Sequence, residues 1–313
     1  MDIRKETLPV LAPKATEDDI KAVTDTLRSG WWINGPKVKD FESKFAKMVG
    51  KKHAIAVTSN THGLDLVLKA YEINGKESEI MSPTMSFATT VAVPMWNDCT
   101  NVLCDVDPVN MNISVEDVKK KLTNKTKAII CVNLAGILAP IEEIRKIYSG
   151  LIIEDCAHAC YTPGAGANGD VAVWSFQAVK TMPTGDGGMI TTDDDKIAEK
   201  IRKLTWFGIQ STYDRVKHTE TEDEHKTIYK WQYDIDILGY KYYMIDLTAA
   251  LGLSQLSRLN ETMHRRQYIQ QRYNDAFANI SKQIQTPPFS YSVQHYVIKV
   301  DPEKGNYIER VKN

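Results

Sequence analysis

Short apolar segments alternate along this chain with segments that have a helical period. Runs of this length, rich in valine and isoleucine and bounded by turn residues, are typical of buried strands. The segments concerned are HAIAV (53–57), EIMSPTMSFATTVAVPMW (79–96), TNVLCDVD (100–107), KAIICVNLAG (127–136), LIIED (151–155), VAVWSF (171–176) and MITT (189–192). Strands that alternate with helices predict an α/β fold with a mostly parallel central sheet and helices on both of its faces.

Helical segments flank this alternation at both ends. TEDDIKAVTDTLRSG begins with a threonine, Thr16, in the N-cap position and closes with a glycine. An Asn-Gly-Pro turn at 34–36 precedes a second amphipathic helix, and KIAEKIRKLTWFG predicts a third that ends at Gly208. Residues 239–277 have a strong helical period, which fits two long helices or one bent helix. We expect a charged surface excursion at 211–234, a strand at HYVIKV (295–300), a large domain at 1–250 and a small α/β domain at 251–313.

Composition narrows the class of protein. The 313 residues include 39 basic and 40 acidic side chains, so the net charge of −1 favours neither nucleic acid nor a membrane surface as a partner. No stretch is long and apolar enough to span a bilayer, and the N-terminus lacks the apolar region of a signal peptide. Five cysteines without paired spacing do not indicate a disulfide framework. The expectation is a cytoplasmic protein with reduced thiols.

A lysine with candidate chemistry stands on the link between the last two predicted strands. Lys180 follows VAVWSF and precedes a turn that contains Gly185, Gly187 and Gly188. Such a lysine is most often a solvated charge. However, LIIED upstream ends a buried strand on Asp155, and a buried carboxylate is costly unless a cation meets it. A lysine that forms a Schiff base and an acid that holds a pyridine nitrogen protonated together suggest pyridoxal 5'-phosphate (PLP).

Three further motifs bear on this hypothesis. The sequence TSNT (58–61) between a strand and a helix is either a phosphate site at a helix N-terminus or only an N-cap. GAGANG (164–169) has the glycine spacing of a dinucleotide site, but it precedes a strand instead of following one, so we interpret it as a loop. Cys156, His158 and Cys160 alternate without a fourth ligand, so no metal site is predicted.

Taken together, these motifs resemble those of the DegT/StrS type of sugar aminotransferases, which are fold-type-I PLP enzymes. The resemblance runs from LPVLAP (8–13) to HYVIKV and rests on six segments in the same order as in the family. These are GWWINGPKVKDFE, TSNTHGLDL, PTMSFATT, EDCAHA, SFQAVKTMPTGDGGMITT and GYKYYMIDLTAALGLSQL.

The resemblance implies a role for individual residues. Lys180 would form the internal aldimine and move the proton between carbons, and Asp155 would pair with the pyridine nitrogen. His158 would reach the ring hydroxyl, and Phe87 would stack on the ring. The phosphate would be met by four residues near two strand ends, namely Ser59, Asn60, Thr61 and Ser175. Lys241 would enter the site of a neighbouring subunit, so a homodimer with shared sites is expected.

The activity implied is transfer of an amino group from L-glutamate, which becomes 2-oxoglutarate, to a keto-deoxysugar on a nucleotide for surface-glycan or related glycoside biosynthesis. A PLP-dependent sugar dehydratase, which lacks this lysine, and a non-catalytic or regulatory PLP-binding homologue are the alternatives. Two features depart from the family. Asn133 stands where relatives often carry histidine, and relatives continue beyond HYVIKV, so the C-terminal domain is expected to be incomplete.

Overall fold

A seven-stranded sheet forms the centre of the computed structural model, which describes residues 13–209, 235, 237–277, 284–285, 292–297 and 299–300. The strands follow the order β1-β7-β6-β5-β4-β2-β3. Their bounds are β1 His53–Val57, β2 Glu79–Pro83, β3 Thr100–Cys104, β4 Thr126–Val132, β5 Leu151–Asp155, β6 Val171–Ser175 and β7 Gly188–Thr192. All seven apolar segments of the sequence therefore contribute a strand to this sheet.

The direction of each strand determines which strand ends lie together at one edge of the sheet. Strands β2 to β6 pair in parallel, whereas β7 runs antiparallel to both β6 and β1. Since β7 is antiparallel to both neighbours, β1 runs in the same direction as β6. The carboxyl ends of β1, β4, β5 and β6 consequently lie at one edge, together with the start of β7.

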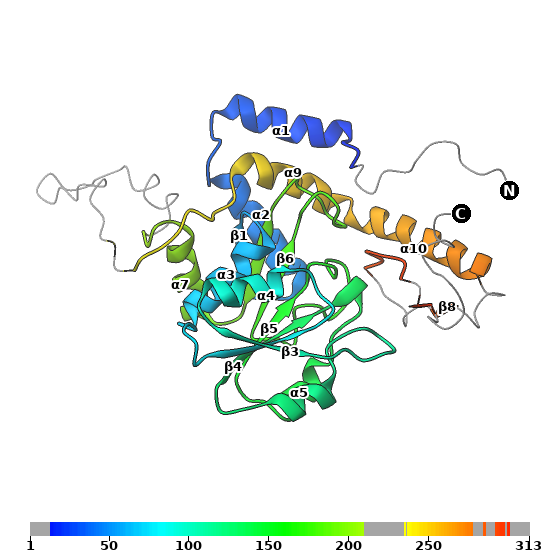
Figure 1. Ribbon diagram of the computed structural model, residues 1–313. Helices are drawn as coiled ribbons and strands as arrows, with labels where there is room; N and C mark the ends of the chain where they lie inside the picture. The colour runs from blue at the N-terminus through cyan, green and yellow to red at the C-terminus, as the bar shows by residue number, and fades with distance from the viewer. Residues whose placement is uncertain are drawn as a thin grey trace, which may run out of the picture.

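Helices cover both faces of the sheet, as the alternation predicts. Their bounds are α1 Glu17–Ser29, α2 Pro36–Val49, α3 Asn60–Ala70, α4 Thr89–Trp96, α5 Val115–Lys121, α6 Ile141–Arg145, α7 Asp195–Thr205, α9 Asp246–Ser257 and α10 Leu259–Phe277. Successive residues of a strand face opposite sides. In β6, Val173 therefore packs in the core with α3 and α7, while Trp174 packs with Phe41 and Phe45 of α2. Figure 1 shows α1 beside α9 on the α2 side, and α10 extending away from the sheet.

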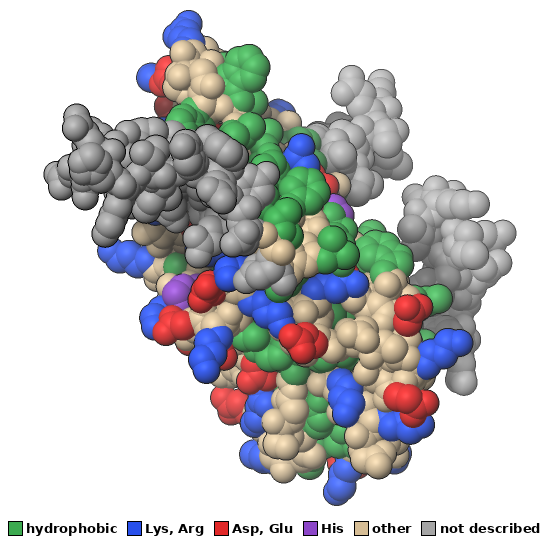
Figure 2. Space-filling view, turned by 90° about the vertical axis from the view of Figure 1, so that its left-hand side faces the viewer, with side chains coloured by type: hydrophobic (Ala, Val, Ile, Leu, Met, Phe, Trp, Pro, Cys, Tyr) green, Lys and Arg blue, Asp and Glu red, His purple; other side chains and the backbone are tan. Residues whose placement is uncertain are grey.

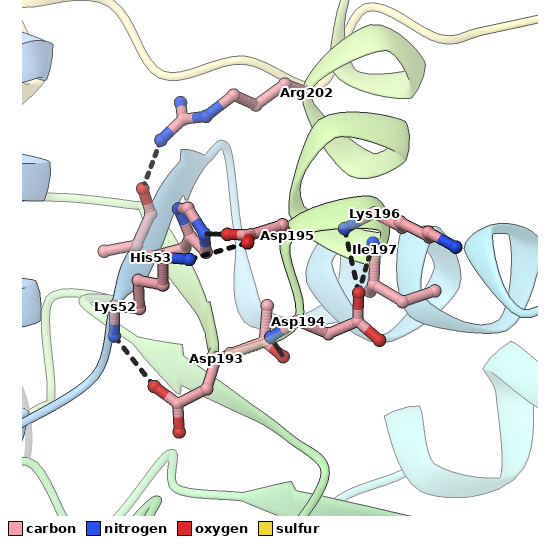
Figure 3. Close-up of polar contacts among 10 residues, drawn as sticks. Lys52, His53, Asp193, Asp194, Asp195, Lys196, Ile197 and Arg202 are labelled. Carbon is pink, nitrogen blue, oxygen red and sulfur yellow. Dashed lines mark hydrogen bonds and ion pairs between the residues drawn. The ribbon is translucent and has the colours of Figure 1, made fainter.

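The start of β1 is tied to the start of α7 by charged groups (Figure 3). The backbone amide of Lys52 donates to Asp193 at 2.8 Å, and His53 Nε2 lies 2.6 Å from Asp195. Asp194 caps α7 by accepting from the amides of its first turn. These contacts join β1 to the chain that follows β7 at one end of the two strands, opposite to the end where Ser59 follows β1 and Gly188 begins β7.

Surface charge has no single sign on the face seen in Figure 2, where Lys and Arg side chains are mixed with Asp and Glu. This pattern agrees with the net charge of −1. Within the described residues, no helix has the length and apolarity needed to cross a membrane.

The structure refines several predicted elements. Of the two alternatives for residues 239–277, the structure has two helices, α9 and α10, which adjoin at Arg258 and begin only at Asp246. Helix α7 ends at Thr205, three residues before Gly208. HYVIKV is not a continuous strand, because residues 295–297 are irregular and only Lys299–Val300 (β9) pairs, with Ile284–Gln285 (β8). The excursion at 211–234 lies outside the described residues, and the domain boundary at 250 stays a prediction.

Candidate active site

The carboxyl edge of the sheet brings Asp155, Ser175 and the N-terminus of α3 together. Asp155 is the last residue of β5 and stands in register with Val173 of β6, and Ser175 ends β6. Ser59 follows β1 as the N-cap of α3, and its side chain accepts the amide of His62 at 3.1 Å. Ligands of open α/β sheets bind at such an edge.

Asp155 is a buried carboxylate that is oriented by two donors. Its exposed fraction is 4%. Oδ1 accepts from the side-chain amide of Asn60 at 3.1 Å and from the backbone amide of Ala157 at 3.0 Å. Burial raises the pKa of Asp155 above its usual value, although both donors and the charge of Lys180 act in the opposite direction. The carboxylate therefore still lacks enough positive charge to offset its burial.

Lys180 is held on a compact turn between β6 and β7. Its backbone amide donates to Gln177 at 2.8 Å, and the turn closes through bonds from Phe176 to Gly187 and from Ala178 to Gly185. Gly185 has a φ of 89°, which favours glycine. Burial lowers the pKa of Lys180, while the charge of Asp155 raises it by a smaller amount. A lowered pKa increases the fraction of free amine at neutral pH, as a nucleophile and base requires.

A close backbone approach places the start of α3 against β7. A Cβ at Gly188 would lie 2.5 Å from the carbonyl carbon of Ser59 and 2.7 Å from the amide nitrogen of Asn60. The absence of a side chain at Gly188 therefore lets the first turn of α3 reach the sheet edge. The hydroxyl of Thr61 lies 2.9 Å from that of Thr89 in α4, so two hydroxyls meet beside the helix N-terminus. A helix start with free amides and hydroxyls is suited to an anion.

His158 lies near the charges of Lys180 and His295. The amide of Ala135 donates to its Nδ1 at 3.3 Å, which leaves the proton of the neutral ring on Nε2. Burial lowers the pKa of His158 to about 3, and the charges of Lys180 and His295 act in the same direction. Nε2 of a neutral His158 is thus available as a hydrogen-bond donor at physiological pH.

Three further predicted residues, Ser175, Phe87 and Lys241, differ in their exposure and in their contacts. Ser175 is 7% exposed, and its hydroxyl accepts from the amide of Gln177. Phe87 precedes α4 with 78% of its surface exposed, so its ring is accessible. Lys241 is exposed, bridges to Trp206 through the backbone, and lies 5.8 Å from the centre of that indole ring.

Two features of the site have no signal in the sequence pattern. The side chain of Asn60, expected among the phosphate-binding residues, instead donates to Asp155 and to the carbonyl of Val173 at 3.2 Å. His295 packs against His158 with ring centroids 4.7 Å apart. The sequence predicts a strand for HYVIKV. A strand pattern does not specify which residue each side chain contacts, so it could not predict the contact between His295 and His158.

The glycine-rich loop at 164–169 binds a buried carboxylate of the central sheet. Gly166 and Gly169 donate their amides to the buried carboxylate of Glu154 at 2.8 and 3.3 Å. Asn133 also donates to Glu154, at 2.7 Å. The loop therefore binds the side chain of Glu154 in β5 and leads into strand β6, which agrees with the interpretation as a loop. It also explains the asparagine at 133, whose amide stabilises this acid.

A cavity of about 650 Å³ opens beside Lys180. Helices α9 and α10 form one wall, and residues 293, 294 and 296 form another. Lys14 and Arg266 line it together with Lys180, and no acidic side chain among the described residues does so. Its size suits a small-molecule substrate, and its lining favours an anionic one.

PLP fits the residues at the sheet edge. The buried Asp155 needs a cation, Lys180 has a lowered pKa, and the N-terminus of α3 lies beside Thr61 and Thr89. These are the groups that a protonated pyridine, an aldehyde and a phosphate require. Fold and site together define a fold-type-I PLP enzyme.

Comparison with known proteins identifies the family. The sequence profile of the DegT/DnrJ/EryC1/StrS aminotransferase family matches residues 13–312, and the chain belongs to this family. It is 37% identical to the spore coat polysaccharide biosynthesis protein SpsC of Bacillus subtilis (strain 168), over 96% of this chain and 78% of that protein.

Solved structures agree. Spr1654 of Streptococcus pneumoniae, described as a sugar aminotransferase, superposes with a TM-score of 0.84 at 27% identity, over 95% of this chain and 79% of that one, in its PMP form. It is also known in a PLP form. The sugar aminotransferase CalS13 of Micromonospora echinospora gives a TM-score of 0.81 at 25% identity, over 95% and 81% of the two chains. The protein is a PLP-dependent sugar aminotransferase.

Proposed function

We propose that this enzyme transfers an amino group from L-glutamate to the keto carbon of a nucleotide-linked deoxysugar, for surface-glycan or related glycoside biosynthesis. The observation that carries the proposal is the pairing of the buried Asp155 with the half-buried Lys180, whose charges interact and whose pKa values both move toward the neutral form of the group. The similarity to SpsC supports a product used in a polysaccharide.

The residues of this chain would divide the work as follows. Asp155 holds the pyridine nitrogen, and Nε2 of His158 donates to the ring oxygen. The phosphate is bound by the first turn of α3, with Ser59, Asn60 and Thr61, and by Ser175. Phe87 covers one face of the ring. These assignments are supported by the shared sheet edge and by the burial of Asp155.

Lys180 is the residue that moves protons. When bound, the cofactor acts as an electron sink that stabilises negative charge on the carbon next to the amine. The Nζ atom of Lys180 takes a proton from this carbon in the amino donor, and returns one to the sugar carbon. General acid-base catalysis at short range needs a lysine whose pKa is below its usual value.

The nucleotide part of the substrate fits the cavity beside Lys180. Its basic side chains, Lys14 and Arg266, match the negative charge of a diphosphate. Because Lys241 is exposed, we also propose a homodimer in which Lys241 reaches the site of the partner subunit. We place the enzyme in the cytoplasm, where nucleotide sugars are made.

A spectroscopic and kinetic experiment tests this function. Purified enzyme loaded with PLP is mixed with L-glutamate, and the loss of the cofactor's visible absorbance is followed. A set of nucleotide-linked keto-sugars is then added, and the aminosugar is identified by mass spectrometry. We expect Lys180→Ala to lower turnover by about 1000-fold or more. Lys196→Ala, a change at an exposed lysine of α7, serves as the control.

Two results would contradict the proposal. Colour that no amino donor changes would favour a binding protein without catalysis. Turnover of Lys180→Ala at the rate of the control would remove the role assigned to Lys180.

A further inference from the structure

A short segment from the C-terminal part of the chain, residues 292–297, lies against the loop that carries Lys180. The side-chain amide of Gln294 donates to the carbonyl of Val179 at 2.9 Å. Arg266 of α10 donates to the carbonyl of Val293 at 3.2 Å. Tyr296 donates its hydroxyl proton to Asn274 of α10 at 3.0 Å. The segment is therefore bound on one side to α10 and on the other to the residue before Lys180.

These contacts fix the position of His295 between Gln294 and Tyr296. Its ring packs against that of His158 with centroids 4.7 Å apart and planes at 75°. The other side of His295 is exposed. His295 thus covers part of His158, which is half-buried.

We propose that His295 is a positioning residue of the active site: its ring shields one side of the half-buried His158 from water and holds that imidazole in its orientation. The proposal rests on the assigned role of His158 at the cofactor ring. It extends the site to residues 292–297, which are 115 positions away from the Lys180 loop along the chain at the Gln294 contact.

The charges around the two rings lower the pKa of both histidines. Lys180 faces both imidazoles, and Arg266 faces His295 from α10. Burial and these cations lower the pKa of His295 as well as that of His158. Both rings are consequently neutral at physiological pH. A neutral His295 can pack edge to face on His158 without adding a charge to a site that already contains Lys180.

The test follows the titration of His158 in the protein without cofactor, so that it does not depend on substrate or amino donor. The protein carries 13C-labelled histidine, and the His158 resonance is assigned with His158→Gln. In the wild type the resonance should stay constant between about pH 5 and pH 8, because the ring is neutral throughout. In His295→Ala, water reaches His158, and we expect its pKa to rise by about 1 or more.

Three further variants complete the design. His295→Phe keeps an aromatic ring on His158 and should leave its resonance constant. Gln294→Ala removes the bond to the Lys180 loop and should shift the pKa of His158 in the same direction as His295→Ala. His264→Ala, at an exposed histidine of α10, is the matched control and should change nothing.

The proposal also predicts that His295→Ala binds PLP more weakly than His295→Phe, as measured by fluorescence titration. A constant His158 resonance in both His295→Ala and Gln294→Ala would overturn the proposal. So would a His295→Phe variant that titrates like His295→Ala. An enzyme that fails to transaminate but shows the expected titrations would contradict the proposed function and leave this inference intact.

Discussion

The bond from Asn60 to Asp155 allows a quantitative test of the cofactor site. Asn60→Ala removes the side-chain donor at 3.1 Å from Oδ1, while the amide of Ala157 remains. The carbonyl of Val173 also keeps a donor, because the amide of Cys156 bonds to it at 2.8 Å. The loss therefore falls on Asp155. A hydrogen bond to a charged group contributes about 1.5–3 kcal/mol, so PLP should bind about 10- to 100-fold more weakly.

The pH dependence has a definite sign. Burial already raises the pKa of Asp155, and removal of a donor raises it further. A protonated carboxyl group cannot pair with the pyridine nitrogen in its charged form, so the deficit in PLP affinity should shrink as the pH is raised. For folding, a buried carboxylate costs free energy only above its unfolded pKa. Asn60→Ala should therefore destabilise the cofactor-free protein more at neutral pH than near pH 4.

The assay is a fluorescence titration of cofactor-free protein with PLP, combined with urea denaturation. A matched control exists at Asn97, another buried asparagine whose amide donates to a carboxylate, Asp65, at 2.8 Å. Asn97→Ala should lower the free energy of unfolding and leave the dissociation constant of PLP unchanged. The reasoning would be refuted if Asn60→Ala bound PLP with wild-type affinity at pH 7, or if its deficit did not depend on pH.

Two further changes test how the fold positions the site. In Gly188→Ala the new Cβ would meet the backbone of Ser59 at 2.5 Å. The free energy of unfolding should therefore fall by about 1–3 kcal/mol, and PLP should bind more weakly. An unchanged urea midpoint and an unchanged PLP affinity would show that α3 can move freely. Asp246→Ala removes the carboxylate that accepts two amides of the first turn of α2, at 3.1 and 3.0 Å, and should cost about 1–2 kcal/mol in the same assay. Asp18→Ala, at an exposed position in α1, should change stability by less than about 0.5 kcal/mol, and equal effects at the two aspartates would contradict the capping role.

Caps show the limit of reasoning from local sequence. Helix α1 carries its own cap, because Thr16 and Asp19 exchange bonds within four residues. Helix α2 begins at Pro36 and has Gly35 in the N-cap position, where glycine offers no side chain, so Asp246 supplies the acceptor to Lys37 from 209 positions further along. The first arrangement follows from a motif. The second depends on the packing of α9 against α2, which no local pattern reports.

The sequence by itself determined the succession of strands and helices along the chain and the turn that carries Lys180. Both follow from local properties, namely the spacing of apolar residues and the backbone freedom of glycine. The family's motifs added the expected role of Asp155. Tertiary structure alone decided that Asn60 orients Asp155, that Glu154 holds the glycine-rich loop, and that His295 covers His158. These contacts join residues far apart in the chain, so they exist only once the sheet and its helices have packed.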